Sequence, residues 1–159
     1  MLPLLLSLAT VASLPSAVPP CPMREAVYQP ADGSPYELRF RTDRSRLIIL
    51  LRSANTGTEY QFNLTAGNGY STTVMQPLAG GTEVATAHTV AIYAFNDDLS
   101  FRGDFPAGDD PAPGRILAPE LGRLLWYEAE AIGGPPVGSA REALPRTFFA
   151  LERCGSDPQ

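Results

Sequence analysis

Hydrophobic and polar residues alternate along several short segments of this chain. Between residues 36 and 41 every second side chain is aromatic or aliphatic and the others are charged, and residues 59–65 repeat the alternation. A period of two places the hydrophobic side chains on one face of a β-strand. Residues 47–51 are all aliphatic, which is typical of a central strand covered on both faces. These are the segments from which we expect one core, containing Phe40, Leu50 and Phe62.

Turn-forming residues separate such segments at short intervals. Eight segments are expected to form strands: 36–41, 47–51, 59–65, 70–76, 83–95, 99–105, 124–132 and 145–154. Many short strands separated by turns are typical of an all-β sandwich or barrel. We expect a single-domain antiparallel β-sandwich, immunoglobulin-like or related. A closed antiparallel β-barrel is the alternative.

One stretch near the C-terminal end fits two kinds of element. Pro119 favours the first turn of a helix, where a missing N–H costs nothing. Residues 124–132 fit either a helix or a strand, and a strand would place Glu128 and Glu130 on one face. We expect a short helical turn at 119–123, followed by a strand.

The first seventeen residues, Met1 to Ala17, are uncharged and mostly apolar. They end in small residues, as a secretory signal peptide does, so we expect cleavage within 13–17. No basic residue precedes Arg24, so either the free amino terminus supplies the positive charge or the chain starts further upstream. Prolines interrupt the apolar run before it reaches the roughly 20 residues of a membrane span. Residues 18–159 are expected to form one β domain.

Only two cysteines are present, Cys21 and Cys154, one near each end of the expected domain. An exported chain with two cysteines is expected to join them, because disulfides persist in oxidising compartments. In the chain-entropy model, closing so long a loop restricts the unfolded state by at most about 5 kcal/mol. We therefore expect a periplasmic or secreted protein closed by one disulfide.

The composition excludes several kinds of chemistry. All twelve basic residues are arginine, so neither a lysine Schiff base nor a Gly-Lys-Ser phosphate loop can form. His88 is the only histidine, which rules out metal sites that need two imidazoles. A net charge of −5 disfavours nucleic acid as a partner. We expect no cofactor, and the abundance of Ala, Gly, Pro and Arg indicates a GC-rich, bacterial genome.

Four arginines within eight residues are the feature that most favours a binding site: Arg39, Arg41, Arg44 and Arg46. On one predicted hairpin they form a local basic stripe on an acidic protein. Guanidinium groups bind carboxylates and phosphates in bidentate geometry, so the stripe suits an anionic envelope component or a protein partner. The alternative is a solvated outer face whose charges are balanced by acids on neighbouring strands.

Three weaker candidates have simpler interpretations. His88 suits a general base, but within the expected strand 83–95 it is more simply an imidazole satisfied by a backbone group or a threonine hydroxyl at a strand end. Glu128 and Glu130, if on a strand, lie about 7 Å apart, as in inverting glycosidases and equally on any exposed strand face. Five aspartates in and before the Gly- and Pro-rich loop 103–114 match no known calcium-loop spacing, which favours solvated turn residues. These aspartates are Asp97, Asp98, Asp104, Asp109 and Asp110.

These observations favour a protein that is not an enzyme. We expect an exported β domain with a binding or structural role in the bacterial cell envelope, without nucleic acid and without a membrane span after the signal peptide is removed. One alternative is a carrier that holds a small apolar ligand in a β-barrel interior. The other is a carboxylate-based hydrolase built on Glu128 and Glu130.

Overall fold

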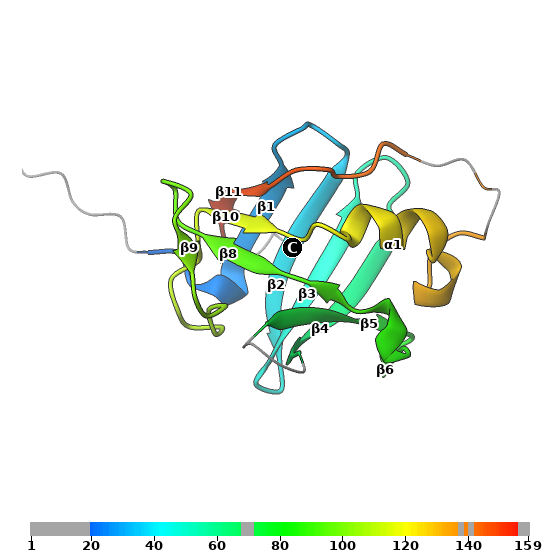
Figure 1. Cartoon of the computed structure of the whole chain (residues 1–159), viewed down its shortest axis with the longest axis horizontal. Coiled ribbons are helices and arrows are strands. Elements are labelled where there is room, and N and C mark those ends of the chain that lie inside the picture. Colours follow the sequence, from blue (N-terminus) through cyan, green and yellow to red (C-terminus); the bar gives the residue numbers. More distant parts are fainter. Residues whose placement is uncertain (1–19, 68–71, 137–138, 140–141, 156–159) are drawn as a thin grey trace, which may run out of the picture.

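The computed structural model describes residues 20–67, 72–136, 139 and 142–155. The expected signal peptide and its cleavage site lie outside these residues. Within them, eleven strands form one antiparallel sheet with a short α-helix and three 3₁₀ helices (Figure 1). The strands are β1 (Ala26–Pro30), β2 (Tyr36–Asp43), β3 (Arg46–Ser53), β4 (Glu59–Ala66), β5 (Thr73–Ala79), β6 (Thr82–Glu83), β7 (Val90–Ala91), β8 (Tyr93–Phe95), β9 (Phe101–Arg102), β10 (Arg115–Leu117) and β11 (Phe149–Cys154). The helices are η1 (Met23–Glu25), η2 (Thr86–His88), α1 (Leu121–Tyr127) and η3 (Glu130–Ile132).

Strands β1 to β5 follow one another as an antiparallel meander. Its register agrees with the alternation in the sequence. Leu38 pairs with Leu51 and Phe40 with Ile49, and all four side chains are buried on the inner face. The charged residues between them on β2 lie on the outer face, as a period of two requires.

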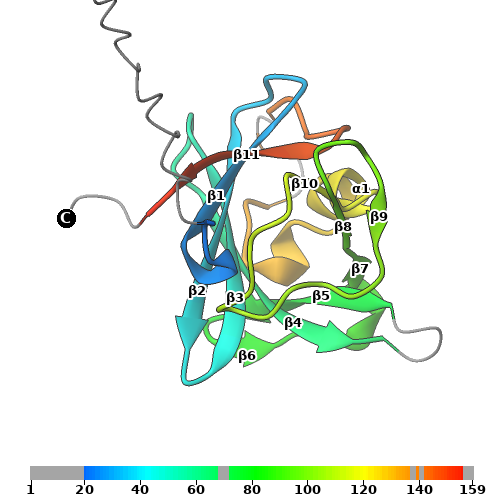
Figure 2. The ribbon, with the colours of Figure 1, turned by 90° about the vertical axis from the view of Figure 1, so that its left-hand side faces the viewer.

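The sheet curls so that its two parts face each other across a common interior (Figure 2). The strand order is β6-β5-β4-β3-β2-β1-β11-β10-β8-β9, and β7 pairs with β5. Because β7 bonds to β5 whereas β8 bonds to β10 and β9, the described sheet is not closed into a barrel. The all-β, sandwich-like prediction is confirmed, and the barrel alternative is wrong.

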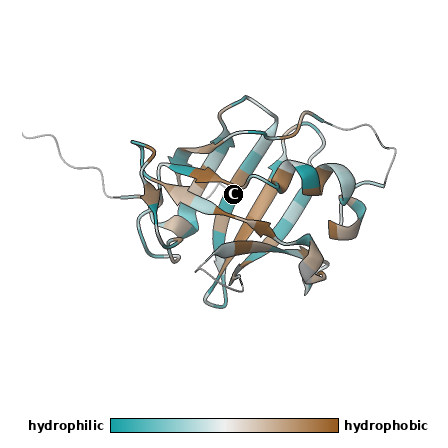
Figure 3. Cartoon of the chain, viewed as in Figure 1, coloured by the Kyte–Doolittle hydropathy of each residue, from teal (hydrophilic) through white to brown (hydrophobic). Residues whose placement is uncertain are grey.

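Large side chains fill the interior between the two parts of the sheet. Phe62 and Phe149 are buried there, and α1 adds Leu121, Leu124 and Leu125. These leucines follow an i, i+3, i+4 spacing, which places them on one helix face. Figure 3 shows hydrophobic positions along β3 and on α1. Burying each such side chain contributes about 1.5–3 kcal/mol, so α1 is an integral part of the core.

The segment that includes α1 is helical where we expected a strand. The strand expected at 124–132 is wrong, and the helical turn expected at 119–123 continues to Tyr127. Leu124 and Leu125 are neighbours in sequence and are both buried. Adjacent residues of a strand point to opposite faces, whereas adjacent residues of a helix share the edge of one face. Packing against the core therefore favours the helix.

Other boundaries differ from the prediction as well. The segment 83–95 is interrupted by η2, which separates β6 from β7, so its high β-propensity does not produce one long strand. The strands expected at 99–105 and 145–154 are confined to β9 and β11. β1 and β10 were not predicted, because they are short and show no clear alternation.

The aliphatic run 47–51 is only partly covered on its outer face. Ile48 is buried, but Leu50 is half-buried and pairs with Arg39 in register on that face. The prediction that Leu50 joins the same core as Phe40 and Phe62 is therefore wrong for Leu50 and confirmed for the two aromatic residues.

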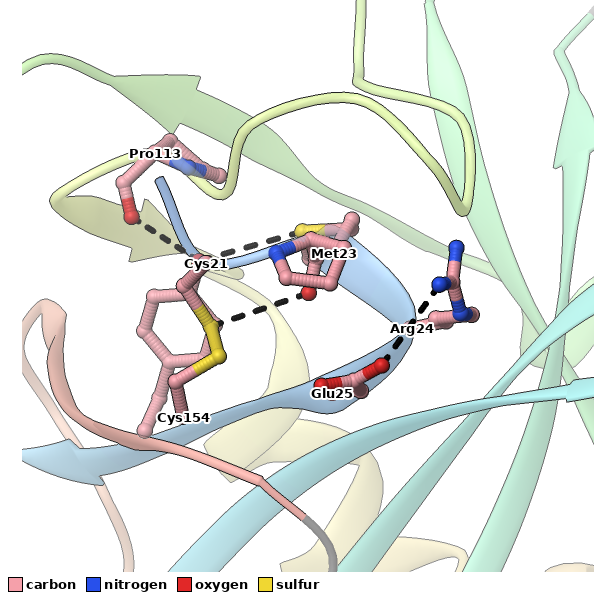
Figure 4. Close-up of a disulfide and its surroundings, with 8 residues drawn as sticks. Cys21, Met23, Arg24, Glu25, Pro113 and Cys154 are labelled. Carbon is pink, nitrogen blue, oxygen red and sulfur yellow. Dashed lines mark hydrogen bonds and ion pairs between the residues drawn. A yellow bond between two sulfur atoms is a disulfide. The ribbon is translucent and has the colours of Figure 1, made fainter. Parts of the chain in front are cut away.

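Cys21 and Cys154 form the predicted disulfide, with Cα atoms 5.5 Å apart (Figure 4). β1, which follows Cys21, pairs antiparallel with β11, which ends at Cys154. Nearby, the buried Tyr28 hydroxyl donates a hydrogen bond of 2.8 Å to the Pro113 carbonyl, and burial raises the pKa of Tyr28. The two ends of the domain are thus joined covalently and by strand pairing. No helix in the described residues is long and apolar enough to cross a membrane.

Candidate functional site

The predicted arginine stripe lies on the β2–β3 hairpin. Arg39 and Arg41 project from the outer face of β2, because Phe40, which lies between them, points into the core. Arg44 and Ser45 form the turn with φ angles of 47° and 75°, and positive φ at both central residues is the requirement of a type I′ turn. Arg46 begins β3 directly after the turn. In Figure 1 this hairpin extends beyond the neighbouring strands.

Arg39 differs from the other arginines of the stripe. Its guanidinium contacts the carboxylate of Glu37 on the same strand, and Glu37 also accepts a hydrogen bond of 2.9 Å from Arg153. Arg39 is half-buried in this arrangement. The other three arginines are exposed, and within the described part of the chain none has an acid within ion-pair distance. Three such arginines and one exposed acid, Asp43, therefore lie within six positions at the hairpin tip.

Two grooves lie beside the β2–β3 hairpin. One, of about 200 Å³, has Arg41 beside Val27 and Leu50 in its lining. The other, of about 600 Å³, has Arg46 and Phe105 in its lining. Each groove thus combines an exposed guanidinium with an apolar surface and one carboxylate, that of Glu25 in the first groove and of Glu83 in the second.

His88 lies in η2 rather than in a strand, and its Nδ1 contacts the Glu128 carboxylate. Arg123 donates a hydrogen bond of 2.6 Å from Nη1 to the same carboxylate and one of 2.8 Å from Nε to Glu120. The hydrogen bonds from His88 and from Arg123 lower the pKa of Glu128. The partner of the imidazole is an acid 40 residues away, not the backbone group or threonine hydroxyl that we expected, and no local pattern could have placed it there. This network joins η2 to the C-terminal end of α1.

Glu128 and Glu130 do not share a strand face. Glu128 follows the last turn of α1, and Glu130 begins η3, where its side chain is exposed. The strand geometry that suggested paired carboxylates is therefore absent from this segment.

Three aspartates of the acidic loops contact other groups of the protein. Asp98 accepts hydrogen bonds from the hydroxyl and the backbone N–H of Ser100, which lower the pKa of Asp98. Asp110 accepts a hydrogen bond from a backbone N–H of its own loop, and Asp109 contacts Arg24. Among the described residues, no group of three or more His, Cys, Asp or Glu side chains is placed to hold a metal ion.

A pocket that the sequence did not indicate lies at the other end of β2. Its volume is about 240 Å³, and its lining includes Tyr36, Ser53, Tyr60 and Glu142. The register places Tyr36 opposite Ser53. Glu142, however, lies 89 residues from Ser53 in a segment without alternation. Only the folded chain brings these side chains together.

The described residues thus contain three candidate functional sites. These are the exposed arginines of the hairpin tip, the His88–Glu128–Arg123 network and the pocket beside α1. Fold alone does not assign a function to any of them. No protein-family model matches this chain, and comparison with curated proteins and with solved structures gave no match either.

Proposed function

We propose that this chain is an exported, non-catalytic binding domain of the bacterial cell envelope, and that the tip of its β2–β3 hairpin binds an anionic envelope polymer. Export is supported by the apolar leader Met1 to Ala17 and by the disulfide between Cys21 and Cys154. Such a bond persists in oxidising compartments, the bacterial periplasm among them.

The observation that carries the proposal is the state of three arginines. Arg41, Arg44 and Arg46 are exposed, and none has an acid within ion-pair distance among the described residues. The whole chain carries a net charge of −5, so this positive charge is local. A local basic surface attracts anions even on an acidic protein, because charges are screened beyond about 8 Å at physiological ionic strength.

The shape of the hairpin favours an extended anionic polymer. Arg41 comes from β2, Arg44 from the turn and Arg46 from the first residue of β3, so the three guanidinium groups are attached at different points around the hairpin tip. Arg41 and Arg46 each line a groove that also has apolar lining. Guanidinium groups bind carboxylate or phosphate groups in bidentate geometry, and the apolar surface contacts the uncharged part of the polymer.

The two alternatives have less support. A carrier of an apolar ligand needs interior space, whereas leucines of α1 and aromatic residues fill the space between the two parts of the sheet. A hydrolase that uses Glu128 needs that carboxylate to be free, whereas His88 and Arg123 both contact it.

The proposal is tested with two double variants that remove equal charge. Arg41→Gln with Arg46→Gln removes the two arginines that line the grooves, and Arg52→Gln with Arg146→Gln removes two exposed arginines elsewhere. Exposed charges contribute only about 0–1 kcal/mol to folding, so both variants are expected to fold. Retention on isolated envelope material is expected to fall for the hairpin variant and to persist for the control. Equal retention of the hairpin variant and the parent chain would contradict the proposal.

A further inference from the structure

The pocket beside α1 has apolar walls and one carboxylate. It lies between α1 and the ends of β2, β3 and β4 that are remote from the arginine hairpin. Tyr36, Tyr60 and Leu125 contribute the apolar lining, and Glu142 contributes the charge. The eight-residue strand β2 separates this pocket from the hairpin turn by roughly 20 Å. The pocket and the hairpin are therefore separate sites.

A buried hydroxyl holds the Glu142 carboxylate in place. Ser53, only 1% exposed, donates a hydrogen bond from Oγ to this carboxylate, whose two oxygens both lie 2.7 Å away. The same Oγ accepts a hydrogen bond of 3.0 Å from the backbone N–H of Thr56. An ionised carboxylate has about four acceptor positions, so one serine leaves most of them for a ligand.

Within the described part of the chain, no cation neutralises the charge of Glu142. No arginine or histidine in the described ranges lies within ion-pair distance of its carboxylate. Its charge reaches the neighbouring ring: burial and, next, the charge of Glu142 raise the pKa of Tyr36 to about 12. The described lining of the pocket is therefore negative as well as partly apolar, and it favours a positively charged ligand over an anion.

The size of the pocket limits the ligand. Its volume of about 240 Å³ is below the range of roughly 300–1,000 Å³ that is typical of drug-sized ligands. One wall is closely packed around Tyr60: a Cβ atom on Gly134 would lie 2.7 Å from the Tyr60 hydroxyl and 2.9 Å from the Ala129 carbonyl oxygen. A side chain at Gly134 would displace Tyr60, so this glycine allows the ring to occupy its position.

We propose that this pocket binds a small organic cation whose ammonium group contacts Glu142 and whose carbon atoms pack against Tyr36, Tyr60 and Leu125. Aromatic faces attract cations through the ring quadrupole, and a carboxylate forms a charge-assisted hydrogen bond with an ammonium group. A hard metal ion such as calcium takes six to eight oxygen ligands, which one carboxylate and a few hydroxyls do not supply. An organic ammonium ion matches both the charge and the apolar walls.

The ligand class is tested on the unchanged chain with three probes of similar size. These are n-butylammonium, the neutral n-pentanol and the anion pentanoate. Calorimetry measures the binding, and the fluorescence of Trp126, which is next to Leu125 in α1, gives an independent signal. We expect n-butylammonium to bind at least about tenfold more tightly than the other two, the loss expected when a charged hydrogen bond is absent. Equal binding of n-pentanol, or no binding of n-butylammonium, would overturn the proposal.

Two variants locate the site. Glu142→Gln keeps the shape of the side chain and removes its charge, and we expect n-butylammonium to bind about tenfold more weakly. Glu59→Gln makes the same change at an exposed position outside the pocket lining and is expected to leave binding unchanged. Unchanged affinity in Glu142→Gln would overturn the assignment. The hairpin variant, Arg41→Gln with Arg46→Gln, is expected to bind n-butylammonium like the parent chain, so the two proposals fail or hold separately.

Discussion

Phe62 and Glu59 show how the face of one strand is set residue by residue. They lie three positions apart on β4, so the period of two places them on opposite faces of the sheet. Phe62 is fully buried in the core, whereas Glu59 is exposed. The burial of these two side chains therefore follows from their parity, although Asn63, on the same face as Glu59, is buried as well.

The prediction at this scale concerns stability. Phe62→Ala is expected to lower the free energy of unfolding by about 3–5 kcal/mol, because it removes buried surface and leaves a cavity. Glu59→Ala is expected to change it by less than about 0.5 kcal/mol. Urea unfolding followed by circular dichroism measures both values. Similar losses in the two variants would mean that the faces of β4 are assigned wrongly.

At the scale of elements, the sequence predicts strands whose two faces differ in polarity. The alternation at 36–41 and at 59–65 places β2 and β4 correctly. It does not predict α1, because adjacent Leu124 and Leu125 acquire a common face only when the chain packs as a helix on the core. Local patterns and tertiary packing conflict there, and packing prevails.

The candidate site, like the secondary structure, was only partly predictable from the sequence. The outward position of Arg41 follows from parity, and the turn position of Arg44 follows from the break between two strands. The contact of Arg39 with Glu37 depends on side-chain conformation, which parity does not define. The pocket beside α1 needs Glu142, which comes from a loop without periodicity, so only the fold places it there.

The contact between η2 and α1 gives a prediction about pH. His88 and Arg123 lower the pKa of Glu128, so their contacts stabilise the fold when this carboxylate is ionised. That stabilisation is present above the ordinary pKa of glutamate and is lost as pH falls through the lowered pKa of the folded state. Glu128→Gln is therefore expected to be less stable than the parent chain at neutral pH. This difference in stability is expected to disappear at acidic pH.

Urea unfolding across a pH series measures this difference. Glu130→Gln is the matched control, because Glu130 is exposed in η3 and no pH-dependent difference is expected for it. If the difference in free energy of unfolding between Glu128→Gln and the parent chain stays constant down to strongly acidic pH, ionisation of Glu128 is not the cause of that difference.

At the scale of the whole molecule, one disulfide and one strand pair join the two ends of the domain. β1 lies between β2 and β11, so the pairing near the disulfide connects strands from the beginning and the end of the chain. Replacing Cys21 and Cys154 by serine is expected to lower the free energy of unfolding by up to about 5 kcal/mol, since the bond closes almost the whole domain into one loop.

Thiol titration of the denatured chain checks the oxidation state directly. Without reduction it is expected to find no free thiol, and after reduction it is expected to find both cysteines. Two reactive thiols before reduction would contradict the disulfide and, with it, the support for an oxidising compartment.

The binding of a polyanion by the hairpin is the central functional claim, and its dependence on salt tests that claim most directly. The measurement is the affinity of the purified chain for long-chain polyphosphate, by calorimetry, over a series of sodium chloride concentrations. We expect binding that weakens steeply with salt, because exposed charges are screened over about 8 Å at physiological ionic strength and less at higher salt. Most of this binding is expected to be lost in Arg41→Gln with Arg46→Gln and retained in Arg52→Gln with Arg146→Gln. If the hairpin variant binds polyphosphate like the parent chain at every salt concentration, the hairpin tip is not the binding site.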